Sequence, residues 1–408
     1  MGNSFQEIRV GLSGSGFIAR GLCGVLWNAP GLSLTAILSR RPNPALPTGA
    51  EAAKLTSSIS EFVDLCDVVV ECSGDPLWAA ELVDAAFQAG RPVITMNAEF
   101  QVVAGTYFAE RGLLSEAEGD QPGCIAALAR DVRGMGFSPV VFGSQKGFIN
   151  LKPERAEMER WAKRFGQSVD KIFSFTDGSK VQIESVLVAN GLGAGLLAPG
   201  LCGPAHATTR AGAVELSYRA LAETGSPVVD YVLNENGQGE VFVAATHDGS
   251  HTAALSYLKL GDGPFYYFER PFHLSYLEIP KSIIAVVRDG VPLLNNGSDP
   301  GYSVAAVAKR KLQKGEFLAR CLGTELARGT AVNIRDEPDH VPIGLLQNVV
   351  VEDTIEEGEL LTSRNVAVPD SLAAKAWEFT RSKVLSPRLL RADARAGASS
   401  RGAERSRS

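Results

Sequence analysis

Short apolar runs alternate with amphipathic stretches through the first third of the chain. Runs rich in β-branched residues predict strands at 8–13, 32–39, 67–72, 92–96 and 139–142. The stretches between them predict helices at 19–28, 60–65, 78–89 and 123–135. This alternation indicates βαβ units and a doubly wound α/β sheet, which the helix and strand between residues 123 and 142 are expected to complete.

The pattern changes after about Gly143. A charged helix is predicted at 154–165, and a hairpin follows whose strands, 171–175 and 180–183, flank a turn at 176–179. Further strands at 228–233, 239–245 and 254–259 make this region α+β. From Tyr302 a third pattern begins, in which a strand, a polar run and a Gly-Glu turn occur twice, at 304–316 and 349–359. The C-terminal region is therefore expected to be small and mostly β.

A chain of 408 residues is too long for one hydrophobic core. We expect an N-terminal domain over 1–145, a second domain over 146–300 and a third over 301–375. Residues 387–408 hold six Arg against one Asp and one Glu and show no periodicity, so they are predicted to be a disordered basic tail.

Charge and cysteine usage exclude several classes of protein. The net charge of −6 argues against general nucleic-acid binding, which needs a basic face. The six cysteines form no Cys-x-x-Cys pair and are expected to be reduced thiols. The longest apolar stretch, 186–202, is broken by polar residues, Pro and Gly, so it is not a membrane span. We expect a cytoplasmic homo-oligomer that acts on a small molecule, without nucleic-acid or membrane partners.

A glycine motif stands between the first predicted strand and the first predicted helix. Gly14, Gly16 and Ala19 form Gly-x-Gly-x-x-Ala, in which Gly14 permits a tight turn and Gly16 leaves room for a pyrophosphate. The helix N-terminus supplies free N–H groups for the phosphates. The motif therefore predicts a dinucleotide-binding (Rossmann) domain; the alternative is a glycine-rich turn without a ligand.

The end of the second predicted strand indicates which dinucleotide binds. NAD-binding proteins usually place a carboxylate there for the ribose 2′-hydroxyl. This chain has Ser39, Arg40 and Arg41 instead. Two guanidinium groups suit a 2′-phosphate, so NADPH is the predicted cofactor; the alternative is a solvated surface pair of arginines.

Six segments in this order identify a family: VGLSGSGFIA, VVVECSG, VITMNAE, EGDQPG, SFTDGSK and RPFHLSYLEIP. Over about residues 5–375 the chain resembles the homoserine dehydrogenase-like oxidoreductases with a C-terminal SAF domain. That family includes proteins similar in activity to 1-deoxy-D-xylulose 5-phosphate reductoisomerase. The resemblance implies that residues 301–375 form the SAF domain.

The resemblance also implies the cofactor contacts. It places the phosphates on the turn around Gly14 and Gly16, with Phe17 and Ile18 as further contacts. It places Ser73 and Gly74, after the strand predicted at 67–72, beside the cofactor, and Asn97 near the nicotinamide. Homoserine dehydrogenases carry Asn-Lys where this chain has Asn97-Ala98. The missing lysine counts against plain homoserine oxidation.

Carbonyl reduction needs a group that stabilises the developing alkoxide and donates a proton. Lys146 and Lys180 stand on either side of the predicted domain junction, and we assign Lys180 to proton donation and Lys146 to substrate binding. The alternative is that both are solvated loop lysines. Glu99, Asp120 and Asp177 are candidates to bind substrate or Mg²⁺ or Mn²⁺, although Asp120 also suits a helix cap and Asp177 a turn.

These observations predict an NADPH-dependent reductase of a small polar carbonyl compound, ketose-phosphate-like or sugar-acid-like. Coupled isomerisation, which would require a divalent cation, is a hypothesis that the family resemblance adds. The alternatives are oxidation of an amino-acid alcohol, as in homoserine dehydrogenases, and a sensor that binds NADPH without turning anything over.

Overall fold

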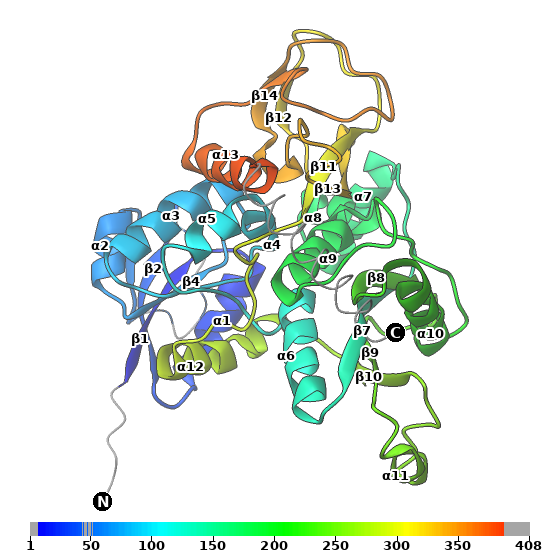
Figure 1. Ribbon diagram of the computed structural model, residues 1–408. Helices are drawn as coiled ribbons and strands as arrows, with labels where there is room; N and C mark the ends of the chain where they lie inside the picture. The colour runs from blue at the N-terminus through cyan, green and yellow to red at the C-terminus, as the bar shows by residue number, and fades with distance from the viewer. Residues whose placement is uncertain (1–6, 43, 45–46, 48–49, 51, 387–408) are drawn as a thin grey trace, which may run out of the picture.

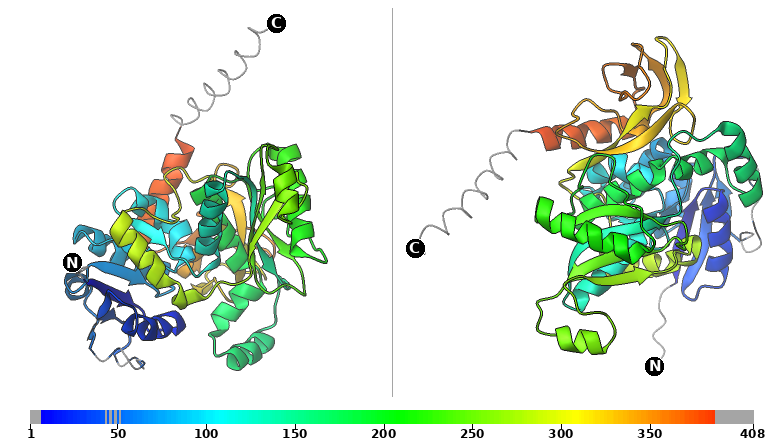
Figure 2. Two further views of the ribbon diagram at one scale, coloured as in Figure 1. Left: turned by 90° about the horizontal axis from the view of Figure 1, so that it is seen from below. Right: turned by 90° about the vertical axis from the view of Figure 1, so that its right-hand side faces the viewer.

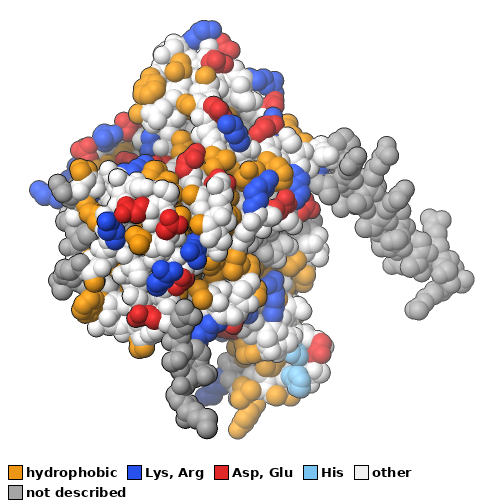
Figure 3. Space-filling view, turned by 90° about the vertical axis from the view of Figure 1, so that its left-hand side faces the viewer, with side chains coloured by type: hydrophobic (Ala, Val, Ile, Leu, Met, Phe, Trp, Pro, Cys, Tyr) orange, Lys and Arg blue, Asp and Glu red, His pale blue; other side chains and the backbone are white. Residues whose placement is uncertain are grey.

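The computed structural model describes residues 7–42, 44, 47, 50 and 52–386 (Figures 1 and 2). The predicted tail at 387–408 lies outside these residues. In the described part of the chain, none of the helices combines the length and the apolar character needed to cross a membrane. On the face shown in Figure 3, basic and acidic side chains are interspersed, so this face carries no continuous basic surface.

The first sheet is parallel and doubly wound, as predicted. Its strand order is β3-β2-β1-β4-β5-β6. The strands are β1 (Ile8–Ser13), β2 (Leu32–Leu38), β3 (Lys54–Thr56), β4 (Val68–Glu71), β5 (Val93–Thr95) and β6 (Leu114–Glu116). All neighbouring pairs are parallel, so the carboxyl ends of the strands meet at one edge.

Helices cover both faces of this sheet. Alternate residues of β4 point to opposite sides, with Val68 and Val70 in one core cluster and Val69 in the other. The core of the first face contains residues of α1 (Phe17–Trp27) and α12 (Ile279–Asp289), and that of the second contains residues of α2 (Ile59–Asp64) and α3 (Pro76–Gln88). Helix α12 thus returns from far along the chain to the first sheet, beside α1 (Figure 1).

The second sheet has the order β10-β9-β7-β8. Its strands are β7 (Ser138–Lys146), β8 (Val228–Leu233), β9 (Val241–Thr246) and β10 (Tyr266–Arg270). Helices α6 (Gln121–Gly134) and α9 (Ser179–Leu192) lie against one face, and α10 (Thr209–Arg219) lies against the other. The strand predicted at 139–142 is therefore present as β7, but it belongs to this sheet and does not complete the first, in which β6 takes the last place.

Three strands predicted in the middle region, at 171–175, 180–183 and 254–259, are wrong. The segment predicted as a hairpin forms two helices, α8 (Val169–Thr176) and α9, and residues 252–257 form the short helix α11 (Thr252–Tyr257). Ser168 caps α8 by accepting from Lys171 N, and Gly178 turns the chain between the helices with a φ of +81°. The charged helix predicted at 154–165 is confirmed as α7 (Arg155–Phe165).

The C-terminal region is mostly β, as predicted, while its assignment as an SAF domain stays a prediction. Strand β11 (Tyr302–Ala308) pairs with β13 (Ala327–Asn333). A second small sheet contains β12 (Phe317–Arg320), β14 (Gln347–Val351) and β15 (Val366–Ala367). The closing helix α13 (Leu372–Leu385) packs on α3 of the first domain, whereas β11 and β13 pack on α9 of the second.

Candidate active site

The glycine turn between β1 and α1 is shaped to receive a dinucleotide. Gly14 has a φ of +121°, and a Cβ at this position would lie 2.9 Å from the carbonyl oxygen of Cys72, so only glycine fits. A Cβ on Gly16 would meet no atom within 4 Å, which leaves open space in front of the helix N-terminus. The turn lines a cavity of about 120 Å³ together with Ser73 and Trp78. These features fit a pyrophosphate held by the backbone.

Arg40 and Arg41 line the same cavity. The guanidinium of Arg40 lies 2.7 Å from Asp75 and 5.0 Å from the centre of the Trp78 ring. Asp75 also caps α3 by accepting from Leu77 N at 3.1 Å. The two arginines therefore face the predicted cofactor site.

The other predicted cofactor contacts lie around this turn. The ring of Phe17 meets Tyr276 edge-on with centroids 5.7 Å apart. Ile18 packs on the core cluster beneath α1, and Gly74 turns the chain after β4 with a φ of +67°. Asn97 follows β5 and is buried; its Oδ1 accepts from Phe100 N, while its Nδ2 has no partner in the described part of the chain.

The centre of the site is the ammonium group of Lys180. It lies 3.3 Å from Glu99, 3.5 Å from Asp120 and 3.7 Å from the third carboxylate, Glu184. The groups come from α9, from α4 (Ala98–Phe100) and from the N-cap of α6. The structure thus brings three of the sequence-predicted residues together at the junction of the two sheets.

Electrostatics fix the charge states in this cluster. Burial alone would lower the pKa of Lys180, but Glu99, Asp120 and Glu184 outweigh it and hold its pKa well above the usual value. Burial would raise the pKa of Asp120, yet Lys180 and the N–H of Gln121 lower it overall. Asp120 is therefore both a helix cap and a charged partner of Lys180.

Glu184 links the two predicted lysines, and sequence reasoning missed it. Its carboxylate lies 3.7 Å from the Nζ atoms of both Lys146 and Lys180. Burial raises the pKa of Glu184 to about 7, because the lysines offset it only in part. Burial also lowers the pKa of Lys146, whose Nζ donates to Gln121 at 2.6 Å. The only signal in the sequence is that Glu184 follows Lys180 by four residues on one helix face.

Asp177 does not belong to this cluster. Its Oδ1 accepts from Ser179 N at 2.9 Å, and its Oδ2 bonds to the ammonium of Lys309. Its role is therefore to join the α8–α9 turn to the C-terminal region, which corrects its assignment as a catalytic candidate.

The donor set does not fit a divalent cation. The ammonium of Lys180 occupies the position between Glu99 and Asp120 that a metal would take. Among the residues that the structure describes, no three or more His, Cys, Asp or Glu side chains are arranged to hold a metal ion. We therefore derive no step through a metal.

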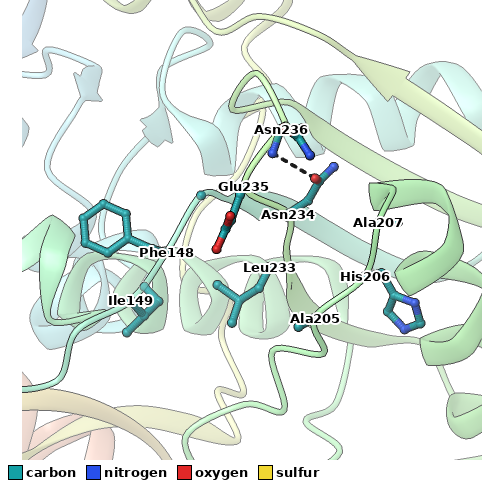
Figure 4. Close-up of a pocket in the computed structure, with 10 residues that line it drawn as sticks. Phe148, Ile149, Ala205, His206, Ala207, Leu233, Asn234, Glu235 and Asn236 are labelled. Carbon is teal, nitrogen blue, oxygen red and sulfur yellow. Dashed lines mark hydrogen bonds between the residues drawn. The ribbon is translucent and has the colours of Figure 1, made fainter.

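A larger cavity of about 480 Å³ is lined by the segment that follows β7, beginning with Gly147, and by the end of β8 (Figure 4). Leu233, in its wall, is the register partner of Lys146 across β7 and β8, so both side chains point to the same face of the sheet. Phe148 and Ile149 form an apolar side, and Glu235 and His206 are polar members of the lining. This cavity has room for a small organic molecule next to the lysine cluster.

Comparisons with known proteins agree with this site. Residues 14–110 match the family model "Homoserine dehydrogenase, NAD binding domain", and residues 119–279 match "Oxidoreductase DRL, catalytic domain". No curated protein matches the chain.

Solved structures with a similar backbone arrangement include dehydrogenases. A putative myo-inositol dehydrogenase from Sinorhizobium meliloti is 14% identical, with 70% of this chain and 90% of that chain covered and a TM-score of 0.38. A probable dehydrogenase from Thermotoga maritima is 15% identical with the same coverage and a TM-score of 0.42. These scores are too low to carry an argument, so the assignment rests on the two family models.

The two matched segments contain the glycine turn and the Asp120–Lys180–Glu184 part of the cluster respectively. The chain is therefore an NAD(P)-dependent oxidoreductase, in which residues 14–110 match the NAD-binding domain of homoserine dehydrogenases and residues 119–279 match the catalytic domain of the DRL oxidoreductases.

Proposed function

We propose that the protein is an NADPH-dependent reductase of a small polar carbonyl compound. The observation that carries this proposal is the buried ammonium of Lys180, which stands among three carboxylates at the junction of the cofactor sheet and the second domain. Its partner Glu99 lies on the helix that Asn97 caps, directly after β5. A carbonyl bound beside Asn97 is therefore within reach of a fixed cation.

When bound, the nicotinamide supplies the hydride. The carbonyl π bond breaks, a C–H bond forms, and the oxygen takes a proton from Nζ of Lys180. The high pKa keeps Lys180 protonated at neutral pH, and an alkoxide is basic enough to accept its proton. Glu184, whose pKa is about 7, is placed to return a proton to the neutral amine.

The preference for NADPH is part of the proposal. Arg40 and Arg41 line the cofactor cavity after β2, where a ribose-binding carboxylate is missing. Asp75 pairs with the guanidinium of Arg40 at the cavity wall, so a 2′-phosphate would compete with this carboxylate for the guanidinium. A 2′-phosphate in this place would accept two parallel N–H bonds from a guanidinium.

The family resemblance supports a ketose-phosphate-like or sugar-acid-like substrate. Coupled isomerisation would need another means of holding the dihydroxy-carbonyl group, because Glu99 and Asp120 already bind Lys180. Simple reduction is therefore the reaction that the site supports best.

The test is to follow NADPH oxidation with a panel of ketose phosphates, sugar acids that carry an oxo group and uncharged ketoses. We expect Lys180→Met to lower kcat and kcat/KM together by about 10²–10⁴-fold, since the contact strengthens in the transition state. Lys163→Met, which changes an exposed lysine of α7, is the matched control. NADPH binding without turnover of any compound would favour the sensor, and faster NADP⁺ reduction by homoserine would favour the oxidation of amino-acid alcohols.

A further inference from the structure

A buried carboxyl group at the end of β4 has no part in the reaction described above. Glu71 is the last residue of β4, and its side chain is completely buried in the centre of the first sheet. Its register partners are Ser13 on β1 and Thr95 on β5, which are equally buried. Burial of a carboxyl group costs free energy unless hydrogen bonds compensate for it, so the groups that Glu71 binds indicate its role.

One carboxyl oxygen holds the loop after β4. Oε1 of Glu71 accepts from the backbone N of Ser73 at 2.7 Å. Ser73 lines the cofactor cavity, and its hydroxyl accepts from Asp75 N at 3.3 Å. Between Glu71 and Ser73, the carbonyl oxygen of Cys72 faces the glycine turn, where a Cβ on Gly14 would lie 2.9 Å away. Glu71 therefore fixes a loop that forms part of the wall of the cofactor cavity.

The other carboxyl oxygen holds the loop after β5. Oε2 of Glu71 accepts from the hydroxyl of Thr95 at 3.0 Å, and the same hydroxyl accepts from Asn97 N at 3.0 Å. Asn97 caps α4, on which Glu99 lies 3.3 Å from the ammonium of Lys180. One buried side chain thus connects the loop after β4 to the loop that leads to Lys180.

The order of the strands predicts where the nicotinamide lies. The neighbouring strands β2, β1, β4 and β5 end at the same edge of the sheet. Arg40 follows β2 and the glycine turn follows β1, so a dinucleotide with its 2′-phosphate at Arg40 and its pyrophosphate at the turn continues over β4 and β5. Its nicotinamide half then lies beside Ser73 and Asn97, the two loops that Glu71 connects.

We propose that Glu71 is a positioning residue for the nicotinamide half of the cofactor. It holds the loops after β4 and β5 in one arrangement, so that the hydride donor faces Lys180. This inference rests on the proposed function and goes beyond it, because it gives a role to a residue that acts only through its hydrogen bonds to other residues. The adenosine half depends on Arg40 and Arg41, so Glu71 should affect the two halves of the cofactor differently.

The experiment compares two ligands of the cofactor site in Glu71→Leu. NADPH contains both halves, whereas adenosine 2′,5′-bisphosphate contains only the adenosine half. Leucine accepts no hydrogen bond, so both loops lose their shared anchor. We expect NADPH to bind about tenfold more weakly or worse in a fluorescence titration, and the bisphosphate to bind within about threefold of wild type by calorimetry. Glu71→Gln should bind NADPH nearly as tightly as the wild type, because its amide can accept from Ser73 N and donate to the hydroxyl of Thr95.

Two further variants complete the design, and melting curves verify the folding of each. Thr95→Val keeps the shape of the side chain but removes the connection between Glu71 and Asn97, so NADPH should bind about threefold to tenfold more weakly and the bisphosphate as before. This variant decides the question if Glu71→Leu does not fold. Glu116→Leu is the matched control, since it removes a buried carboxyl group beside Thr95 that accepts from Gln101 at 3.3 Å, and it should leave NADPH binding unchanged.

Unchanged NADPH binding in a folded Glu71→Leu or Thr95→Val variant would overturn the positioning role. An equal loss of NADPH and the bisphosphate, or an equal loss of NADPH binding in Glu116→Leu, would overturn it as well, because either result would mean a general disturbance of the sheet. None of these measurements requires turnover. If the wild type reduces no carbonyl while Glu71→Leu selectively loses NADPH, the proposed function fails and the positioning role stands.

Discussion

Replacing Glu184 by glutamine should stabilise the protein at alkaline pH while it damages the active site. The pKa of Glu184 lies at about 7 against a usual 4.5, chiefly because burial disfavours the charged carboxylate. This difference corresponds to about 3 kcal/mol, within a factor of two. Glutamine has the shape of the neutral acid and cannot ionise, so the substitution removes that cost.

The sign of the pH dependence follows from proton linkage. Between pH 4.5 and about 7 the folded protein keeps the proton of Glu184 and the unfolded chain has lost it, so wild-type stability falls as pH rises. Below pH 4.5 both states are protonated, and this contribution is fully present. Glu184→Gln should therefore match the wild type near pH 4.5 and exceed its free energy of unfolding by about 2–3 kcal/mol at pH 8.

The assay is urea unfolding of wild type and variant at a series of pH values from 4.5 to 8. Glu157→Gln, at a partly exposed position on α7, controls for loss of a carboxylate elsewhere. NADPH oxidation measured on the same samples should be lower in Glu184→Gln, which separates the catalytic effect from stability. A difference in stability that does not change with pH, or a variant less stable than wild type at pH 8, would refute the reasoning.

Three further outcomes are expected. Replacing both Arg40 and Arg41 by alanine should weaken NADPH binding by at least tenfold and leave NADH binding nearly unchanged, as fluorescence titration would show; tighter binding of NADH by the wild type would contradict the preference. Asp75→Asn keeps the helix cap but frees Arg40, so NADPH affinity should rise by a few-fold in the same titration, and unchanged affinity would mean that the ion pair does not compete with the phosphate. Lys309→Met leaves the buried carboxylate of Asp177 unpaired and should lower the free energy of unfolding by about 3–5 kcal/mol, whereas the double variant with Asp177→Asn should recover much of that loss; urea unfolding measures both.

The first domain was predictable because its signals are local. The strand predicted at 8–13 coincides with β1, and the glycine turn and the helix after it follow directly. The strand β6 was missed because it spans only Leu114–Glu116. The return of α12 could not be foreseen, since no local pattern says which surface a distant amphipathic helix will cover.

The incorrect prediction of a hairpin explains why Glu184 was missing from the predicted site. Residues 171–175 form a short run rich in Ile and Phe, which is typical of a strand, but the cap at Ser168 and the turn at Gly178 make two helices instead. In the hairpin, Glu184 would lie beyond the strand 180–183 and outside the site. In the helices, Glu184 stands one turn from Lys180 and contacts it. Lys180, Glu99 and Asp120 were found because each follows a recognisable motif.

The C-terminal region contacts both domains that border the active site, the first through α3 and the second through α9. Its backbone N–H groups at Gly329 and Ala331 donate to Ser179 and Gln182 on α9. Its last helix, α13, rests on α3 of the other domain (Figure 1). A hinge rotation between the two sheets would have to break the contacts with α3 or the hydrogen bonds to α9. Substrate enclosure is therefore expected to come from local movements of loops, with the distance between hydride donor and Lys180 held nearly constant through the catalytic cycle.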